Sequence, residues 1–271
     1  MIEINAALEV ATATHPGMVR SHNEDSIAAE AEVGLAVLAD GMGGYNAGEV
    51  ASGIAVEMIR TEMRKSLSVK KPGERNGLNA EQLITDHATR ANAAIYHASQ
   101  SQPQYSGMGT TLVVALWHDN QMSVGHIGDS RLYRLRGGAL EQVTRDHSLL
   151  QEQIDSGMIT REQARHSQNK NLVTRAVGID PEVETEVHSY PVQAGDIYLM
   201  CSDGLNDMVT DEDIQMILSS FQANLPLAAQ QLVQQACDNG GRDNVSVILV
   251  RIVKAFPART GLMDKLKTWL R

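Results

Sequence analysis

The stretch Leu35-Ala36-Val37-Leu38-Ala39-Asp40-Gly41-Met42-Gly43-Gly44 decides the fold of this 271-residue chain. An uncharged apolar run leads directly into an aspartate and a glycine-rich turn. A short apolar run that ends at Asp and Gly is typical of a buried strand. Asp-Gly is also a common turn pair, so one such aspartate says little about chemistry.

Three further aspartates stand in the same context. Asp129 follows the run 124–128, Asp203 follows 197–202, and Asp243 precedes 245–250. Four carboxylates at strand ends can converge on one edge of a sheet, where unpaired charges would repel one another. A hard divalent cation with oxygen ligands relieves that repulsion, and Mg²⁺ or Mn²⁺ fits best. The repeated pattern therefore predicts a metal enzyme.

Composition limits the class of protein. At 42% hydrophobic and 4% aromatic residues, the chain can bury a sizeable core of aliphatic side chains. The net charge of −10 argues against a nucleic-acid partner, because no basic stripe can displace counterions. Cys201 and Cys237 belong to no CxxC or Cys/His cluster, which indicates buried thiols. With no signal-peptide pattern and no run of about 20 apolar residues, we expect a cytoplasmic protein.

Hydrophobic periodicity predicts the order of the secondary structure. Strands are expected at 7–14, 33–39, 109–118, 121–128, 131–136, 195–201 and 245–253. Helices are expected from 47 to about 63, from 80 to 98, near 211–220 and at 225–238, with Asn79 as an N-cap. Residues 147–168 form a short helical insertion with a capping box at 160–163. Strands with helices grouped in twos favour a β core inside helix layers, as one domain with an inserted flap.

The loop 17–25 indicates which kind of substrate the predicted metal site acts on. Arg20 carries a planar cationic fork suited to two phosphate oxygens. Glu24 and Asp25 follow within a few residues, where they can reach metal-bound waters. An anion clamp beside an acidic metal cluster suits hydrolysis of a phosphate ester. The alternative is that Arg20 only forms a surface salt bridge with Glu24 or Asp25.

These motifs together resemble the metal-dependent protein serine/threonine phosphatases, the PPM or protein phosphatase 2C family, in their compact bacterial form. The resemblance runs from about residue 6 to residue 253. Its carriers are 20–25, 40–44, 107–111, 128–131, 146–148, 174–178, 202–204 and 243–244. It implies an α+β fold: a four-layer αββα sandwich of two antiparallel sheets flanked by helix pairs. It also implies a phosphatase domain over 1–254, with a flap at about 147–175 beside the cleft.

The resemblance implies a role for each site residue. Asp40 would bridge two Mn²⁺ or Mg²⁺ ions, and the Gly41 carbonyl would bind the first of them. Asp203 and Asp243 would bind the second ion. Asp129, together with Asp203, would hold a third, weaker metal. Glu24 and Asp25 would contact the metals through water. Arg20 would bind the substrate phosphate.

One position departs from the animal-type pattern. Animal members carry a histidine after the Asp-Gly pair, proposed as the general acid for the leaving alkoxide, and here that position is Met42. Methionine cannot donate a proton. A metal-bound water and His22 are the two remaining candidates for the acid.

Two other enzyme classes fit poorly. In a dinucleotide-binding loop starting at Gly41, the third glycine would fall at Asn46, and Asp40 would face the pyrophosphate with like charge. The adjacent pairs Asp129-Ser130 and His147-Ser148 say nothing about triad geometry, and no G-x-S-x-G elbow is present.

The expected activity is metal-dependent hydrolysis of phosphoserine and phosphothreonine in proteins by a metal-activated water. The expected partners are phosphorylated proteins and a cognate Ser/Thr kinase whose action the enzyme opposes, and the chain is expected to be a monomer. A non-catalytic regulator on the same fold usually loses a core aspartate, and none is missing here. A phosphatase of small metabolites stays open.

The tail 255–271 is expected to form an amphipathic helix. Leu262, Leu266, Trp269 and Leu270 share one helical face. Such a helix can dock on a partner or a membrane surface, but a terminal helix more often folds back on its own domain. We therefore favour an intramolecular role for the tail.

Overall fold

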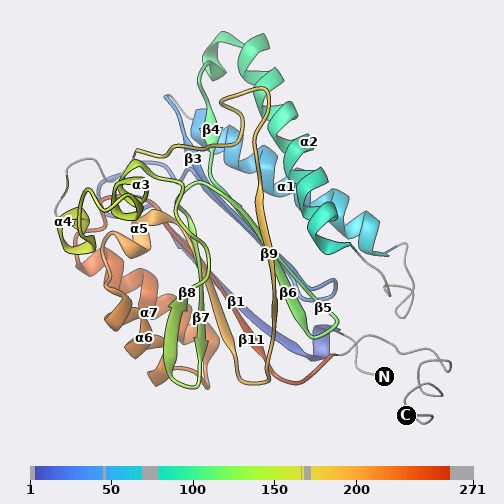
Figure 1. Cartoon of the computed structure of the whole chain (residues 1–271), viewed down its shortest axis with the longest axis vertical. Coiled ribbons are helices and arrows are strands. Elements are labelled where there is room, and N and C mark those ends of the chain that lie inside the picture. Colours follow the sequence, from blue (N-terminus) through green and yellow to red (C-terminus); the bar gives the residue numbers. More distant parts are fainter. Residues whose placement is uncertain (1–3, 45–46, 69–78, 166, 168–171, 257–271) are drawn as a thin grey trace.

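Two antiparallel sheets pack face to face in the computed structural model, which describes residues 4–44, 47–68, 79–165, 167 and 172–256 (Figure 1). The strand order of the first sheet is β1 (Leu8–His15), β11 (Val245–Ile252), β10 (Ile197–Cys201), β7 (Arg131–Arg136) and β8 (Ala139–Gln142). The order of the second is β2 (Asp25–Glu30), β3 (Leu35–Met42), β5 (Leu112–His118), β6 (Gln121–Ile127) and β9 (Glu186–Pro191), and β4 (Gly109–Thr110) pairs with β3.

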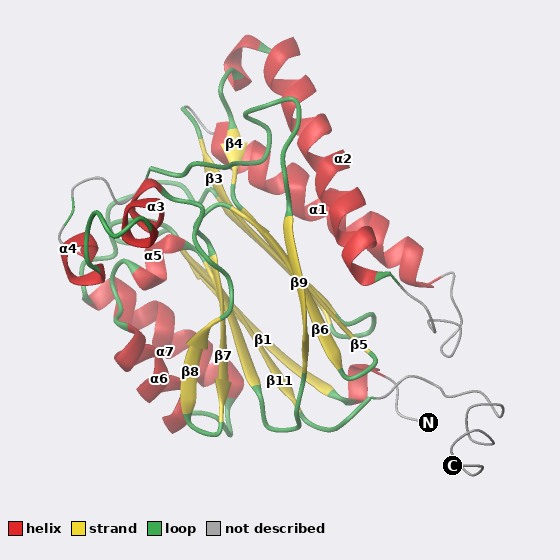
Figure 2. Ribbon diagram, in the orientation of Figure 1, coloured by secondary structure: helices red, strands yellow, loops and turns green. Residues whose placement is uncertain are grey.

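Helix pairs cover the outer faces of both sheets (Figure 2). The helices α1 (Ala47–Ser68) and α2 (Ala80–Ser101) lie over the second sheet, whereas α6 (Asp211–Ser220) and α7 (Leu225–Asp238) lie over the first. Shorter helices stand near one end of the sandwich: α3 (Leu149–Asp155), α4 (Arg161–Arg165) and α5 (Asp203–Asn206). The 3₁₀ turns η1 (Ile4–Ala6) and η2 (Pro103–Tyr105) complete the fold. The αββα sandwich predicted from the sequence is confirmed.

The apolar run of β3 has no polar side because both faces of the strand are buried. Leu35, Val37 and Ala39 face the layer of α1 and α2, while Ala36 and Leu38 face the other sheet. Side chains alternate between the faces of a strand, so a strand enclosed by two cores is apolar throughout. This placement brings Asp40 to the end of the sandwich.

The elements that periodicity missed are mostly the outer strands of the sheets. β2, β8 and β9 each end the strand order of their sheet. Their burial patterns are mixed or exposed, so they lack an apolar run. The loop predicted over 17–25 accordingly ends one residue early, because Asp25 begins β2.

Several local predictions are confirmed. Asn79 caps α2 by accepting a hydrogen bond from the Gln82 amide at 3.0 Å. Thr160 and Gln163 form the reciprocal bonds of a capping box. In contrast, the predicted strand 109–118 is interrupted at residue 111, which separates β4 from β5; both of these strands pair with β3.

Among the described residues, no helix has the length and apolar character needed to cross a membrane. The amphipathic helix predicted for the tail lies outside the described residues, which end at Phe256.

Candidate metal and phosphate site

A cavity of about 230 Å³ collects nearly all of the predicted site residues. Its lining consists of Arg20, Glu24, Asp40, Gly41, Met42, Gly43, Thr111, Asp129, Val173, Asp203 and Asp243. Asp129 and Asp203 also line a second cavity of about 340 Å³, which extends toward α3 and α4. Of the predicted set only Asp25 is absent from the lining. Residues up to 223 positions apart in sequence therefore meet at one end of the sandwich.

The backbone of Asp40 is held by the pair Thr110 and Thr111. The Asp40 amide donates to Thr111 Oγ1 at 3.0 Å, and the Thr111 amide donates to the Asp40 carbonyl at 2.8 Å. The Thr110 hydroxyl donates to the same carbonyl at 2.8 Å. With its main chain bonded in this way, Asp40 leaves its carboxylate free to face the cavity.

Gly41 lies against the first turn of α1. A Cβ on Gly41 would stand 2.2 Å from the Gly48 carbonyl oxygen, and a Cβ on Gly48 would stand 2.8 Å from the Gly41 carbonyl carbon. Two backbones can approach this closely only where neither residue carries a side chain. The Gly41 amide donates to the Glu24 carbonyl at 3.1 Å, which brings the segment around Glu24 to the same point.

Asp25 stands behind the cavity wall, paired with Asp40 in the β2–β3 register. Its Oδ2 accepts a 2.8 Å hydrogen bond from the Ser202 hydroxyl. Its Oδ1 is buried and has no hydrogen-bond partner among the residues that the structure describes. An unpartnered buried carboxylate oxygen is costly, and a nearby cation or an ordered water would satisfy it.

The cavity concentrates negative charge. Burial, followed by the charges of neighbouring carboxylates, raises the pKa of Asp40 and of Asp203 well above the ordinary range. Burial likewise raises the pKa of Asp25 to about 6 and that of Asp129 to about 7. Carboxylates that resist ionisation in this way fit divalent cations, whose charge favours the ionised form.

Arg20 pairs with Asp243 rather than with Glu24 or Asp25. Its Nη2 donates to Asp243 Oδ2 at 2.7 Å, and the charge of Asp243 is the main reason that the Arg20 pKa is raised. About half of the Arg20 side chain remains exposed at the cavity mouth. The surface salt bridge considered from the sequence thus forms with a predicted metal ligand.

His22 is exposed and is not part of the cavity lining. Met42 does line the cavity, as its position after Asp40 and Gly41 predicts. Proximity therefore gives no support to His22 as the general acid.

Asn244 supports the site from behind, and the sequence assigned it no role. Its Oδ1 accepts a hydrogen bond from the Glu24 amide at 2.8 Å, and its Nδ2 donates to the carbonyls of Pro16 and His22 at 3.0 and 2.8 Å. One buried amide thus fastens the loop that carries Arg20 and Glu24 to the start of β11. Its place next to Asp243, in the motif 243–244, was the sequence feature that could have indicated this role.

Comparisons with known proteins agree with this geometry. A family model described as protein phosphatase 2C matches residues 18–238. The serine/threonine protein phosphatase PstP of Mycobacterium tuberculosis is 40% identical over 255 residues, which cover 93% of this chain and 46% of PstP. The serine/threonine phosphatase Stp of Listeria monocytogenes is 35% identical over 243 residues, covering 88% of this chain and 93% of Stp.

A solved structure shows the same architecture. The catalytic domain of the serine/threonine protein phosphatase PstP, in complex with two manganese ions, matches with a TM-score of 0.79 and 38% identity. The match covers 91% of this chain and 99% of that domain. The chain therefore belongs to the protein phosphatase 2C family of serine/threonine protein phosphatases. It spans about half the length of PstP and nearly the whole of Stp.

Proposed function

We propose that this chain hydrolyses phosphoserine and phosphothreonine in proteins with the help of Mn²⁺ or Mg²⁺. The observation that carries the proposal is one cavity lined by an arginine and by carboxylates from five separate chain segments. The family membership and the manganese-bound PstP catalytic domain support it.

The ligand assignments follow the family resemblance. Asp40 would contact both ions and the Gly41 carbonyl the first, while Asp203 and Asp243 would hold the second. Glu24 and Asp25 would act through water, and Asp129 would hold a third, weaker ion with Asp203. The raised carboxylate pKa values and the unpartnered Asp25 oxygen support this set. When bound, such ions lower the pKa of a coordinated water and offset charge in the transition state.

Arg20 binds the substrate phosphate in this proposal. Its guanidinium is held by Asp243 at the cavity mouth and is half exposed, so it can turn toward an incoming anion. A planar fork can donate two parallel hydrogen bonds to one phosphoryl group. When Asp243 serves as a metal ligand, its pull on the guanidinium weakens.

Of the two candidates for the general acid, the metal-bound water is the one that this proposal keeps. Met42 has no proton to donate, and the Thr111 hydroxyl already contacts Ser130 Oγ at 2.7 Å and the Asp40 amide. His22 stands outside the cavity.

Residues 1–254 constitute the phosphatase domain in this proposal, and 147–175 is its flap. α3 and α4 fall within that segment and line the second cavity through Leu150, Ile154 and Ala164. The substrates are phosphoproteins modified by a cognate Ser/Thr kinase, and the protein acts as a monomer. The fold-back of the tail 255–271 and a cytoplasmic location stay predictions.

Phosphate release from a phosphothreonine peptide tests the function. Turnover should appear with Mn²⁺ and disappear with excess EDTA. Free phosphoserine serves as the small-metabolite control and should be a much poorer substrate. Folded protein that releases no phosphate from the peptide under either condition would contradict the proposal and favour a regulator. Preference for free phosphoserine would favour a metabolite phosphatase.

A further inference from the structure

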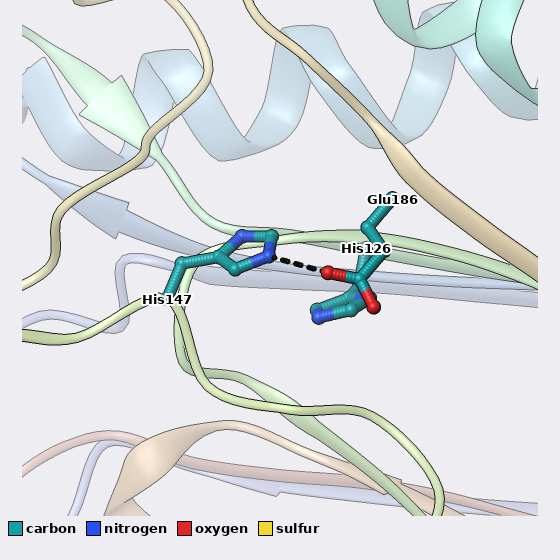
Figure 3. A group of neighbouring side chains, drawn as sticks. All are labelled: His126, His147 and Glu186. Carbon is teal, nitrogen blue, oxygen red and sulfur yellow. Dashed lines mark hydrogen bonds and ion pairs between the residues drawn. The ribbon is translucent and has the colours of Figure 1, made fainter. Parts of the chain in front are cut away.

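His126, His147 and Glu186 form a cluster of neighbouring side chains (Figure 3). Within the described parts of the chain, these three are the group of His, Cys, Asp or Glu side chains whose ligand atoms all lie within 4.8 Å of one another. His147 contacts Gly128, the residue before Asp129. Both histidines are buried, with 1% and 7% of their surface exposed.

The hydrogen bonds of this cluster show which ring nitrogens carry a proton. They leave few free lone pairs that could bind a metal. The Gly128 amide donates to His147 Nδ1 at 3.2 Å, so that nitrogen carries a lone pair. His147 Nε2 therefore carries the proton and donates to Glu186 Oε2 at 3.2 Å. His126 Nε2 lies 2.7 Å from the Arg145 carbonyl, which can only accept, so it is protonated too.

Ring geometry supports the same conclusion. The two imidazoles stack with centroids 4.5 Å apart and planes 20° apart, so their in-plane lone pairs do not converge on one point. Burial lowers the pKa of both histidines, which favours the neutral rings that these hydrogen bonds require. The cluster therefore consists of two stacked neutral imidazoles, of which His147 donates to the Glu186 carboxylate.

His147 forms hydrogen bonds with both the amide and the carbonyl of Gly128. Besides accepting from the Gly128 amide, it donates its own amide to the Gly128 carbonyl at 2.9 Å. Gly128 has a φ of +100°, and a Cβ there would stand 2.7 Å from Thr111 Cγ2. The next residue is Asp129, so these bonds set the direction in which that carboxylate leaves the chain.

The same histidine also joins the two ends of the flap. The Thr174 amide donates to the His147 carbonyl at 2.9 Å, and the Leu149 amide donates to the Leu172 carbonyl at 2.9 Å. Val173 lies between Leu172 and Thr174 in the chain and lines the metal and phosphate cavity. Glu186, on β9, anchors the histidine from the second sheet.

We propose that His147 is a positioning residue that orients the Gly128-Asp129 turn for metal binding through its Nδ1 acceptor, with Glu186 holding the required tautomer. The inference rests on the proposed role of Asp129 as a metal ligand. His147 touches neither substrate nor metal in this arrangement. It acts on the site through the Gly128 peptide.

Two amide variants separate the two ring nitrogens. H147N places an amide oxygen near the position of Nδ1, where it can accept from the Gly128 amide. H147Q places its amide near the position of Nε2, where it can reach Glu186 but not Gly128. D129N serves as the reference for loss of the ligand. H188A is the matched control, because His188 contacts the other oxygen of Glu186 at 2.8 Å and is half exposed.

The main measurement is a titration of the full chain with Mn²⁺. The electron paramagnetic resonance signal of free Mn²⁺ monitors how much of the metal is bound. H147Q should weaken the weakest binding step by at least about tenfold, the size seen when the partner of a metal ligand is removed. D129N should show the same defect, whereas H147N and H188A should stay within about twofold of the wild type. Thermal unfolding in EDTA identifies any variant that has lost its fold.

The outcomes are distinguishable. A defect in D129N with wild-type binding in H147Q would overturn the positioning role alone. Equal defects in folded H147N and H147Q would also overturn it, because the acceptor would then be irrelevant. Unchanged binding in D129N would remove the role of Asp129 as a ligand and the inference with it, while metal-dependent turnover of the wild type would still uphold the proposed function.

Discussion

Asp25 and Asp40 are register partners across the β2–β3 ladder, and the Asp25 oxygen that does not contact Ser202 is buried without a hydrogen-bond partner. A second carboxylate thus stands directly behind the proposed bridging ligand. In the metal-free protein burial, followed by the charge of Asp25, raises the pKa of Asp40, so the two carboxylates resist being ionised together. This pair is therefore a place where folding stability and metal binding conflict.

The D25N variant should make the metal-free protein more stable at neutral pH. The folded-state pKa of Asp25 is raised from 3.8 to about 6, so the folded state binds more protons between these values. Wild-type stability from this group is therefore present below about pH 4 and is lost as the pH rises through 6. Two pKa units correspond to about 3 kcal/mol as an order of magnitude.

Urea unfolding in EDTA measures this effect. The difference between D25N and wild type should be near zero at pH 4 and reach its full size above pH 6. Mn²⁺ should stabilise the wild type more than it stabilises D25N. A difference independent of pH would show that Asp25 acts through packing instead of charge.

The D203N variant should lose nearly all turnover while keeping its fold. Asp203 lines both cavities and is assigned to two ions, so its loss removes metal charge from the transition state. Phosphate release with Mn²⁺ is the measurement, and D238N, at an exposed position on α7, is the control. Near-normal turnover of D203N would refute the metal assignment.

The R20A variant should mainly raise KM for a phosphopeptide. The contact of Arg20 with phosphate exists in both ground and transition states, so its loss weakens binding more than it slows chemistry. R20K should recover part of the loss, because a lysine supplies the charge without the planar fork. Steady-state kinetics at saturating Mn²⁺ gives both constants. If KM is unchanged in R20A, the arginine serves only to hold Asp243.

The G41A variant should be strongly destabilised. The new Cβ would stand 2.2 Å from the Gly48 carbonyl oxygen, so α1 must move away from β3. We expect a loss of about 3 kcal/mol, similar to severe overpacking. The control is G53A in α1, where a Cβ would meet no atom of the described residues within 4 Å. Because alanine favours helices, G53A should gain about 0.5–1 kcal/mol.

Chemical unfolding of both variants tests the pair. A stable G41A would mean that the contact between α1 and β3 yields at little cost. The contrast between Gly41 of β3 and Gly53 of α1 separates the cost of the close backbone approach from the effect of a glycine-to-alanine change where space is free.

Local signals carried much of the fold prediction. Asp119 and Asn120 both adopt positive φ in the tight turn that joins β5 to β6, which is where their residue types place a hairpin turn. The buried central strands were predictable because their sequences are uninterrupted apolar runs. β9 did not, because an outer strand with one exposed side needs no such run.

The candidate site was predictable where motif residues carry the chemistry themselves. Seven of the eight residues assigned from the sequence line one cavity, and the eighth, Asp25, stands next to Asp40. The supporting contacts were not predictable. Asn244 reaches back across 220 residues to the Glu24 amide, and His147 acts on a peptide bond 19 residues away. A single sequence gives no period or spacing for such pairings.

The position of β11 has a consequence for the order of synthesis. This strand lies between β1 and β10, and the adjoining Asn244 fastens the loop around Glu24. A growing chain therefore carries Arg20, Asp40 and Asp203 outside the ribosome long before the strand that brings their segments together exists. We expect the nascent polypeptide to stay without phosphatase activity until Val245–Ile252 has emerged from the ribosome.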